Sequence, residues 1–190
     1  MTWRRPTNWN LKAENDMRIK LKKSLQGKIL DIGGGGEGII GQIYRQQVIA
    51  IDNRQEELDE APDVCDKVLM DATSLSFGEY QFEHVTAFYS MMYMTREEQQ
   101  KAINEASRVL KKGGFLHIWD TVIHCAYPEP FVINLDIDAN GRALHTAYGV
   151  VKMDSQDMKL FIEMCQKADM TLMRKMVNDD QFYLLFNKSR

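Results

Sequence analysis

The sequence lacks the features that would set it apart from ordinary globular proteins. Its three cysteines, Cys65, Cys125 and Cys165, are odd in number and show no CxxC spacing, which argues against a disulfide framework and a cysteine metal site. No apolar run is long enough to span a bilayer. A net charge of −3 creates no overall attraction to nucleic acid. We therefore expect a cytoplasmic protein that binds neither membrane nor nucleic acid and holds no metal ion.

Internal repeats, low-complexity tracts and linker-like stretches are also missing. The 190 residues are therefore expected to form one domain, 1–190. Charge is concentrated locally in one basic stretch, which contains Arg18, Lys20, Lys22, Lys23 and Lys28. We interpret this stretch as a solvated helix face. The alternative, a basic face that binds an RNA or protein substrate, stays open.

The chain does contain alternating helix and strand patterns, which predict an α/β fold with a mostly parallel sheet covered on both faces. Segment 1–27 is expected to form a helical cap, with a helix from Asn10 to about Gln26. Residues 28–120 form the predicted core, with apolar strands at 28–32, 48–51, 67–70, 84–89 and 115–119. Helices are predicted at 37–45 and from Thr95, which forms a capping box with Glu98, to the glycine pair at 113–114.

The alternation stops after residue 120. Segment 121–152 is predicted to be a hairpin insertion that turns at Asn140-Gly141, a sequence that favours tight β-turns. The hairpin either covers the substrate as a lid or extends the edge of the sheet, and the sequence leaves both open. Segment 153–190 is expected to provide a helix that starts at Asp154 or Ser155, followed by two antiparallel strands at the sheet edge.

A glycine run, residues 33–38, satisfies the spacing G-x-G-x-x-G between a strand and a helix, which indicates a nucleotide-type cofactor. Three observations argue against a dinucleotide. Asp31 would repel a pyrophosphate, and Glu37 is expected in the first helical turn, where phosphate would bind. Asp52 follows Gly38 by 14 residues (52 − 38), not by about 20. S-adenosylmethionine, which has a sulfonium, an ammonium and a ribose diol but no phosphate, suits an acidic glycine loop better.

Five segments between residues 28 and 120 resemble, in order, the motifs of the class I S-adenosylmethionine-dependent methyltransferases. They are Ile29–Gly35, Val48–Asn53, Met70–Ala72, Phe82–Ser90 and Arg108–Leu116. The resemblance implies a Rossmann-like sheet of seven mostly parallel strands, with an antiparallel strand at the C-terminal edge. One position departs from the family pattern, because Glu37 stands where the family commonly has a third glycine.

By matching position, the resemblance implies a cofactor site of ten residues: Asp31, Gly33, Gly34, Gly35, Asp52, Asn53, Asp71, Ala72, Tyr89 and Ser90. The first aspartate and the glycine backbone are expected at the methionine part, the second aspartate at both ribose hydroxyls, and the third at the adenine amino group. The tyrosine and serine are expected near the sulfonium. Each aspartate also has a structural alternative, since a carboxylate at a strand end often caps the next helix.

No recognisable motif identifies the methyl acceptor. Methyl transfer is a direct displacement, so a general base is needed only when the acceptor carries a proton; the candidates are His124, His145, Asp120 and Tyr148. The Asp/Asn-Pro-Pro-aromatic motif that accompanies methylation of exocyclic or amide nitrogens is absent, and residues 90–93 read Ser-Met-Met-Tyr there. We favour a small-molecule methyltransferase. An RNA or protein methyltransferase, a non-catalytic cofactor-binding module and an NAD-dependent oxidoreductase are the alternatives, and the oligomeric state is not predicted.

Overall fold

The computed structural model describes residues 18–124 and 127–189, and its main feature is a sheet of seven strands in the order β4-β3-β2-β5-β6-β10-β9. The strands are β2 (Ile29–Ile32), β3 (Val48–Asp52), β4 (Asp66–Leu69), β5 (Phe82–Phe88), β6 (Leu110–Thr121), β9 (Met170–Asn178) and β10 (Gln181–Lys188). Strands β2 to β6 pair in parallel, whereas β10 is antiparallel to both of its neighbours. The predicted fold class is confirmed. The antiparallel strand β10 is not itself the edge of the sheet, because β9 pairs with it and forms the edge.

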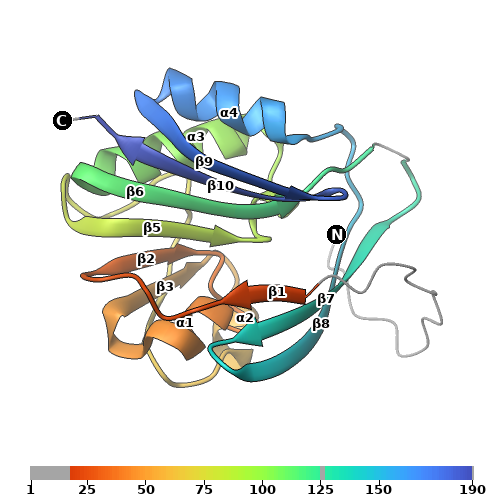
Figure 1. Ribbon diagram of the computed structural model, residues 1–190, viewed down its shortest axis with the longest axis horizontal. Coiled ribbons are helices and arrows are strands. Elements are labelled where there is room, and N and C mark those ends of the chain that lie inside the picture. Colours follow the sequence, from red (N-terminus) through yellow and green to blue (C-terminus); the bar gives the residue numbers. More distant parts are fainter. Residues whose placement is uncertain (1–17, 125–126, 190) are drawn as a thin grey trace.

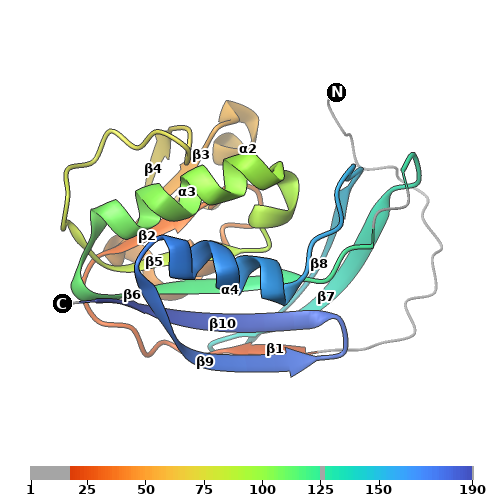
Figure 2. The same ribbon diagram turned by 90° about the horizontal axis from the view of Figure 1, so that it is seen from above.

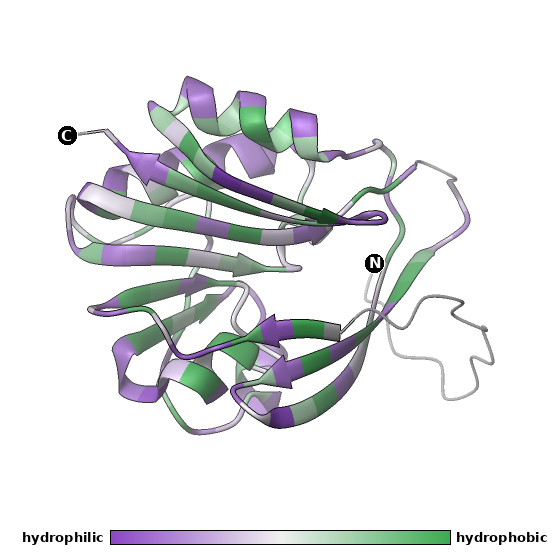
Figure 3. Ribbon diagram, viewed as in Figure 1, coloured by the Kyte–Doolittle hydropathy of each residue, from purple (hydrophilic) through white to green (hydrophobic). Residues whose placement is uncertain are grey.

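Helices cover both faces of this sheet. They are α1 (Ile39–Tyr44), α2 (Gln55–Glu60), α3 (Arg96–Val109) and α4 (Met158–Lys167), with short 3₁₀ turns η1 (Arg45–Gln47) and η2 (Met91–Tyr93). Figures 1 and 2 show α3 and α4 together over the strands β5, β6 and β10, with α1 on the opposite face. Figure 3 shows the apolar residues concentrated in the strands and the polar ones on the outer helix surfaces. No helix in the described ranges is long and apolar enough to cross a membrane.

Local sequence signals set two of the helix starts. The predicted capping box is present, since the Thr95 hydroxyl accepts from the Glu98 N–H and the Glu98 carboxylate accepts from the Thr95 N–H at 2.7 Å. Helix α4 begins later than predicted, after Asp157, whose side chain accepts from the Leu160 N–H at 2.8 Å. The delay has a structural cause, because Gln156 forms a β-bridge with Ile123 and cannot be helical.

Two further boundaries differ from the prediction. Helix α3 stops at Val109 and the chain enters β6 at once, so the glycines 113–114 lie inside a strand and not at a helix end. The helix predicted at 37–45 is also shorter than expected, because α1 begins only after Gly38 and Glu37 precedes it. Glu37 therefore does not occupy a first helical turn.

A second sheet has the strand order β1-β7-β8 and consists of β1 (Arg18–Leu21), β7 (Phe131–Ala139) and β8 (Arg142–Val150). The predicted hairpin is confirmed, with Asn140 and Gly141 at φ values of 54° and 92°, both in the left-handed region that a tight hairpin turn needs. The hairpin does not extend the edge of the seven-stranded sheet. It pairs instead with β1, which runs parallel to β7.

The predicted N-terminal helix is wrong over residues 18–26. Arg18–Leu21 form strand β1, and no helix follows it before β2; residues 10–17 lie outside the described part of the chain. The basic stretch therefore lies on a strand and the loop after it, not on a helix face. Alternation within Arg18–Leu21 suits this arrangement, because Leu21 is buried while Lys20 and Lys22 are exposed.

A chain of side-chain hydrogen bonds crosses the sheet face opposite α3. His84 Nδ1 lies 3.0 Å from His117 Nε2, and His117 Nδ1 lies 3.0 Å from the Tyr183 hydroxyl. The ring of His84 also bonds to the backbone of Gln26. A neutral imidazole ring donates from one nitrogen only. The hydrogen bonds are therefore donated in one direction: from the Tyr183 hydroxyl to His117, from His117 to His84, and from His84 to the Gln26 carbonyl. Burial lowers the pKa of His84 and lowers that of His117 to about 3.

The lowered pKa of His117 predicts a contribution to stability that rises with pH. Between pH 3 and 6.5 the unfolded chain binds a proton at His117 that the folded chain does not, so the contribution of His117 to the free energy of unfolding increases with pH and levels off above 6.5. His117→Phe removes this contribution while keeping an aromatic ring. We expect the wild-type advantage over the variant to grow by about 2 kcal/mol from pH 5 to 6.5, measured by urea denaturation. An advantage that is constant across this range would contradict a neutral, buried His117.

Candidate functional site

The carboxyl ends of the parallel strands meet at one edge of the seven-stranded sheet. Figure 1 shows β5 and β6 pointing toward the side of the molecule where β7 and β8 lie. Ligands of open α/β sheets bind beyond this edge. The predicted site residues are distributed over it, on the ends of β2, β3 and β5 and the loop after β4.

The glycine loop uses its own N–H groups to hold its shape. Gly33 and Gly34 donate to the Ile51 carbonyl at 2.8 and 3.0 Å, and Gly36 donates to the Glu57 carbonyl at 2.8 Å. The backbone of Gly35 bonds to the Asp52 carboxylate. A dinucleotide site needs such N–H groups free for its pyrophosphate. Because all four are already bonded, the loop does not present the donor set that a phosphate requires.

Two carboxylates pack directly against this loop. A Cβ atom at Gly34 would lie 2.6 Å from Asp31 Oδ2, and one at Gly35 would lie 2.8 Å from Asp52 Oδ2 and 2.5 Å from the Glu57 Cβ. These separations are shorter than any tolerated contact, so only glycine fits at either position. The loop therefore brings its backbone carbonyls and two acidic side chains into one small region.

Asp31 is only 2% exposed and accepts a hydrogen bond of 2.7 Å from the Thr86 hydroxyl. Burial raises the pKa of Asp31 to about 7, the Thr86 bond opposes this rise, and the negative charge of Asp52 adds to it. Asp31 is therefore a carboxyl group whose charge changes near neutral pH. A nearby cation would favour its ionised form.

Asp52 ends β3 and is partly buried. Its Oδ1 accepts from the Arg54 N–H at 3.0 Å. Burial raises the pKa of Asp52, while backbone hydrogen bonds and the Arg54 charge oppose the rise. The neighbouring Asn53 is exposed. The side chain of Asp52 thus lies at the end of β3 beside the glycine loop.

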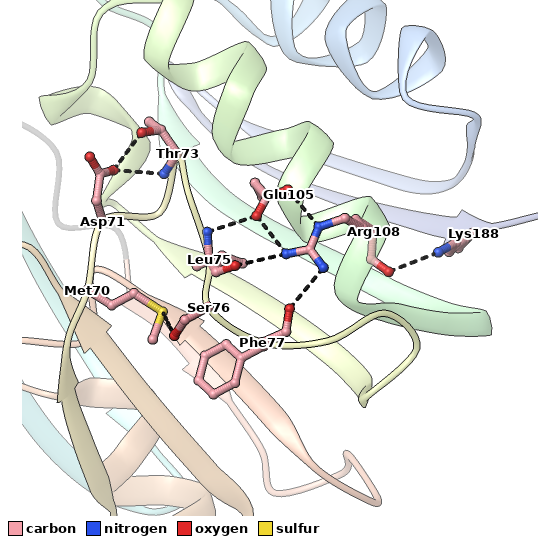
Figure 4. A network of polar contacts seen from close by, with 9 residues as sticks. All are labelled: Met70, Asp71, Thr73, Leu75, Ser76, Phe77, Glu105, Arg108 and Lys188. Atoms are coloured by element: carbon pink, nitrogen blue, oxygen red, sulfur yellow. Dashed lines mark hydrogen bonds and ion pairs between the residues drawn. The ribbon is translucent and has the colours of Figure 1, made fainter.

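Asp71 lies next to Asp52 across the strand ends, because the Met70 N–H donates to the Asp52 carbonyl at 2.9 Å. One oxygen of Asp71 accepts from both the N–H and the hydroxyl of Thr73, each at 2.8 Å (Figure 4). This oxygen therefore stabilises a local turn and does not cap a helix, because no helix lies between β4 and β5. Ala72 beside it is buried.

The loop that carries Asp71 is fixed to α3. Arg108 donates to the carbonyls of Leu75 and Phe77 at 3.0 and 2.9 Å and pairs with Glu105 at 2.7 Å, and Glu105 accepts from the Leu75 N–H (Figure 4). A guanidinium that bonds two carbonyls and a carboxylate at once holds the loop in a single conformation. The position of Asp71 is therefore set by the helix behind it.

Ser90 and Tyr89 follow β5 immediately. The Ser90 hydroxyl donates to the Ile32 carbonyl at 2.6 Å, which holds it against the glycine loop. Tyr89 has a φ of 52°, is 2% exposed, and donates to Gln181 Oε1 at 2.7 Å. Its ring centroid lies 5.9 Å from that of Tyr148 on the hairpin. A bulky residue with positive φ is strained, and such strain is concentrated at functional sites.

Glu37 connects the glycine loop to the hairpin, a contact that sequence reasoning missed. The Thr146 hydroxyl donates to Glu37 Oε1 at 2.6 Å, and the Tyr148 hydroxyl bonds to the same side chain. Burial and the Glu37 charge raise the pKa of Tyr148. The only sequence signal for this role was the acidic residue between two glycines.

Asp120 ends β6 in a buried polar cluster. Its Oδ1 accepts from the Thr121 N–H at 2.8 Å and from Gln156 Nε2 at 2.7 Å, whereas Oδ2 is buried without a hydrogen-bond partner among the described residues. Burial raises the pKa of Asp120 to about 7, and the nearby Lys152 lowers it. Lys152 itself donates to the carbonyls of Met92 and Met94 at 3.1 and 2.7 Å. A buried orphan oxygen calls for a functional explanation.

The four candidate bases separate clearly. His124 is exposed, and His145 is 73% exposed and pairs with Asp136 on the hairpin itself. His145 also lies an odd number of residues from Tyr148 on β8, so the two point to opposite faces of the strand. The raised pKa of Tyr148 keeps its hydroxyl protonated. Asp120 is thus the candidate whose environment suits proton transfer near neutral pH.

Comparisons with known proteins agree with this geometry. Residues 30–118 match a family model described as a methyltransferase domain, and no curated protein matches the chain. Similar solved structures include a SAM-dependent methyltransferase from Methanosarcina mazei (17% identity, 87% of this chain and 94% of that one, TM-score 0.63). An S-adenosylmethionine-dependent methyltransferase from Clostridium acetobutylicum is also similar (13% identity, 86% and 85%, TM-score 0.59).

A third similar structure is a complex that contains the Trm112 methyltransferase activator of Haloferax volcanii (12% identity, 86% of this chain and 82% of that one, TM-score 0.63). At these identities the structural likeness shows the fold, and the family match adds the class of domain. The match spans the glycine loop and all the parallel strands from β2 to β6. Residues 30–118, just under half of the chain, therefore resemble a methyltransferase domain, and the solved structures share the Rossmann-like fold of the seven-stranded sheet.

Proposed function

We propose that this domain transfers the methyl group of S-adenosylmethionine to a small-molecule acceptor bound beneath the β7–β8 hairpin. The supporting observation is the hydrogen bond between Thr146 on β8 and Glu37 on the glycine loop, which joins the hairpin to the cofactor loop. A strand pair fixed across the ligand edge limits the size of the acceptor and excludes water. The hairpin thus serves as a substrate lid.

The cofactor site proposed here has three parts. Asp52 accepts hydrogen bonds from the two ribose hydroxyls, for which two carboxylate oxygens suffice. Asp31 and the carbonyls of the loop, Gly33 to Gly35, face the methionine ammonium. The other carboxylate oxygen of Asp71 and the Ala72 backbone contact the adenine, with Asn53 beside it. Ser90 and Tyr89 lie near the sulfonium.

When bound, S-adenosylmethionine supplies an electrophilic methyl carbon. The residues of this chain contribute binding, orientation and a dry environment, which account for much of the rate of a direct displacement. Tyr89, held by Gln181 and by the ring of Tyr148, gives the acceptor a fixed wall. Asp120 holds the proton of any acceptor that must lose one.

Isothermal calorimetry with S-adenosylmethionine tests this function directly. We expect saturable heat from a single site, followed by transfer of a labelled methyl group to a panel of small acceptors. No heat at millimolar ligand would refute the cofactor site. Binding that persists while no acceptor in a broad panel is methylated would support a non-catalytic module.

Asp52→Ala is expected to weaken cofactor binding by about 1–3 kcal/mol, because two hydroxyls lose their acceptor. Calorimetry measures the change. Asp59→Ala is the matched control, since Asp59 is exposed on α2 and accepts a hydrogen bond from Gln55 on the same helix. Equal affinities for the two variants would show that Asp52 does not contact the ribose.

The raised pKa of Asp31 predicts pH-dependent cofactor binding. Below pH 7 the carboxyl is protonated and attracts an ammonium weakly, so affinity should rise between pH 5.5 and 7.5, by up to about tenfold per unit at the acidic end. In the cofactor-free protein the sign for folding is opposite. The folded state binds the extra proton between pH 3.8 and 7, so the contribution of Asp31 to the free energy of unfolding falls as pH rises through this range.

Asp31→Asn provides the comparison, since its amide oxygen still accepts from Thr86. We expect the variant to bind S-adenosylmethionine weakly and with a flatter pH profile over the same range. The charged neighbour Asp52 and the Cys65 thiol are the other titratable groups that interact with Asp31, and both are retained. An unchanged pH profile in the variant would exclude Asp31 from the ammonium site.

A further inference from the structure

We propose that Arg54 is a positioning residue of the cofactor site: held in place by its ion pair with Glu57, it keeps the Asp52 carboxylate ionised and able to accept both ribose hydroxyls. This inference rests on the proposed function, in which Asp52 binds the ribose, and it adds the two side chains that control that contact. It is carried by an ion pair, by a backbone hydrogen bond and by close contacts with the glycine loop.

The carboxylate of Asp52 lies where a ligand can approach it. Asp31 is only 2% exposed, whereas Asp52 is partly exposed at the end of β3. Gly35 and Gly36 of the neighbouring glycine loop are partly exposed as well. The end of β3 and this part of the loop therefore form a surface that is open to solvent at the ligand edge of the sheet.

Only an ionised carboxylate offers acceptors to both hydroxyls of a ribose. A protonated carboxyl group carries a hydrogen-bond donor in place of one acceptor. Burial raises the pKa of Asp52, and Asp31 adds repulsion whenever it is ionised. Both influences favour the protonated form of Asp52, so a positive group beside it is needed to maintain its charge.

Arg54 supplies this positive group. Its backbone N–H donates to Asp52 Oδ1 at 3.0 Å, and the charge of its guanidinium lowers the pKa of Asp52. The guanidinium pairs with Glu57 on α2 at 2.9 Å, which holds the side chain beside the first turn of that helix. An arginine stays protonated at every pH at which an aspartate titrates, so its effect on Asp52 is constant.

Glu57 connects this ion pair to the glycine loop. Its carbonyl accepts from the Gly36 N–H at 2.8 Å. Its Cβ lies 2.5 Å from the point where a Cβ at Gly35 would stand, and its Oε2 lies 3.2 Å from the same point at Gly36. The loop proposed to meet the cofactor and the side chain that holds Arg54 are therefore in direct contact.

The two charges of the ion pair act on Asp52 in opposite senses. Arg54 attracts its carboxylate, and Glu57 repels it, because the repulsion that Asp52 exerts on Glu57 is mutual. The side chains of Arg54 and Glu57 are 47% and 34% exposed, and exposed pairs of this kind add little to stability. Removing each charge separately therefore distinguishes an electrostatic role from a structural one.

S-adenosylhomocysteine and its 2′-deoxyribose analogue isolate the ribose contact, because they differ by one hydroxyl. Both are titrated by calorimetry into the full chain between pH 4 and 7, and the ratio of the two affinities is recorded. Their ammonium groups are identical, so the titration of Asp31 affects both affinities alike. We expect the ratio to favour the ribose form and to rise with pH as Asp52 becomes ionised.

Arg54→Gln should move this rise to higher pH and Glu57→Gln should move it to lower pH, each by about half a unit, because solvent screens a partly exposed pair. Arg54→Lys keeps the charge and should stay close to the wild type. The two glutamine variants break the same ion pair, so a purely structural pair would change both profiles in one direction. Shifts of the same sign, or no shift in either variant, would overturn the proposal.

Lys159→Gln and Glu163→Gln are the matched controls, because these residues form an exposed ion pair on α4 and the variants change the net charge by the same amounts. Neither should move the profile. A wild type that binds both ligands equally would remove Asp52 from the ribose, and this inference with it, while leaving methyl transfer intact. Failure to bind S-adenosylmethionine or its product would instead refute the proposed function itself.

Discussion

The close approach of carboxylates to a glycine backbone is the constraint on which the site depends. Gly34 and Gly35 leave room that no other residue could leave, and the carboxylates of Asp31 and Asp52 fill it. In that position Asp31 is buried and its pKa is raised, while the loop N–H groups are bonded to β3, α2 and Asp52. The same packing thus removes the donors that a diphosphate needs, and in the function proposed above it supplies the acceptors for a cationic nucleoside.

Much of the fold follows from patterns that are local in sequence. Strands buried on both faces give continuous apolar runs, and β2, β3 and β5 were predicted on that basis. The capping box at Thr95 and the turn at Asn140-Gly141 are fixed by residues next to one another, and both were predicted correctly. The strand-end aspartates could be placed because parallel strands bring their carboxyl ends to a single edge.

Contacts between distant segments account for what the sequence did not predict. Residues 18–21 form a strand because Leu21 pairs with Ala139, 118 positions away (139 − 21). In isolation the recurrence of Met17, Leu21 and Leu25 every four positions favoured a helix. Likewise α4 starts late because Gln156 bridges to Ile123. In the site, Glu37 bonds to Thr146, Lys152 to Met92, and Asp120 to Gln156. Each of these partners lies far along the chain, so composition and spacing give no signal for it.

Glu37 shows how a departure from a family pattern can be functional. A glycine at this position would leave the loop and the hairpin unconnected, whereas the carboxylate accepts from Thr146 and Tyr148 and so joins them. Hydrogen bonds to an ionised carboxylate are stronger than those between neutral groups, so these contacts hold the hairpin firmly. A second contact, from Arg142 on β8 to Gln42 Oε1 at 2.9 Å, joins the same hairpin to α1. The hairpin is thus held at the edge where the glycine loop lies by side chains of β8 that bond to the loop and to the helix after it.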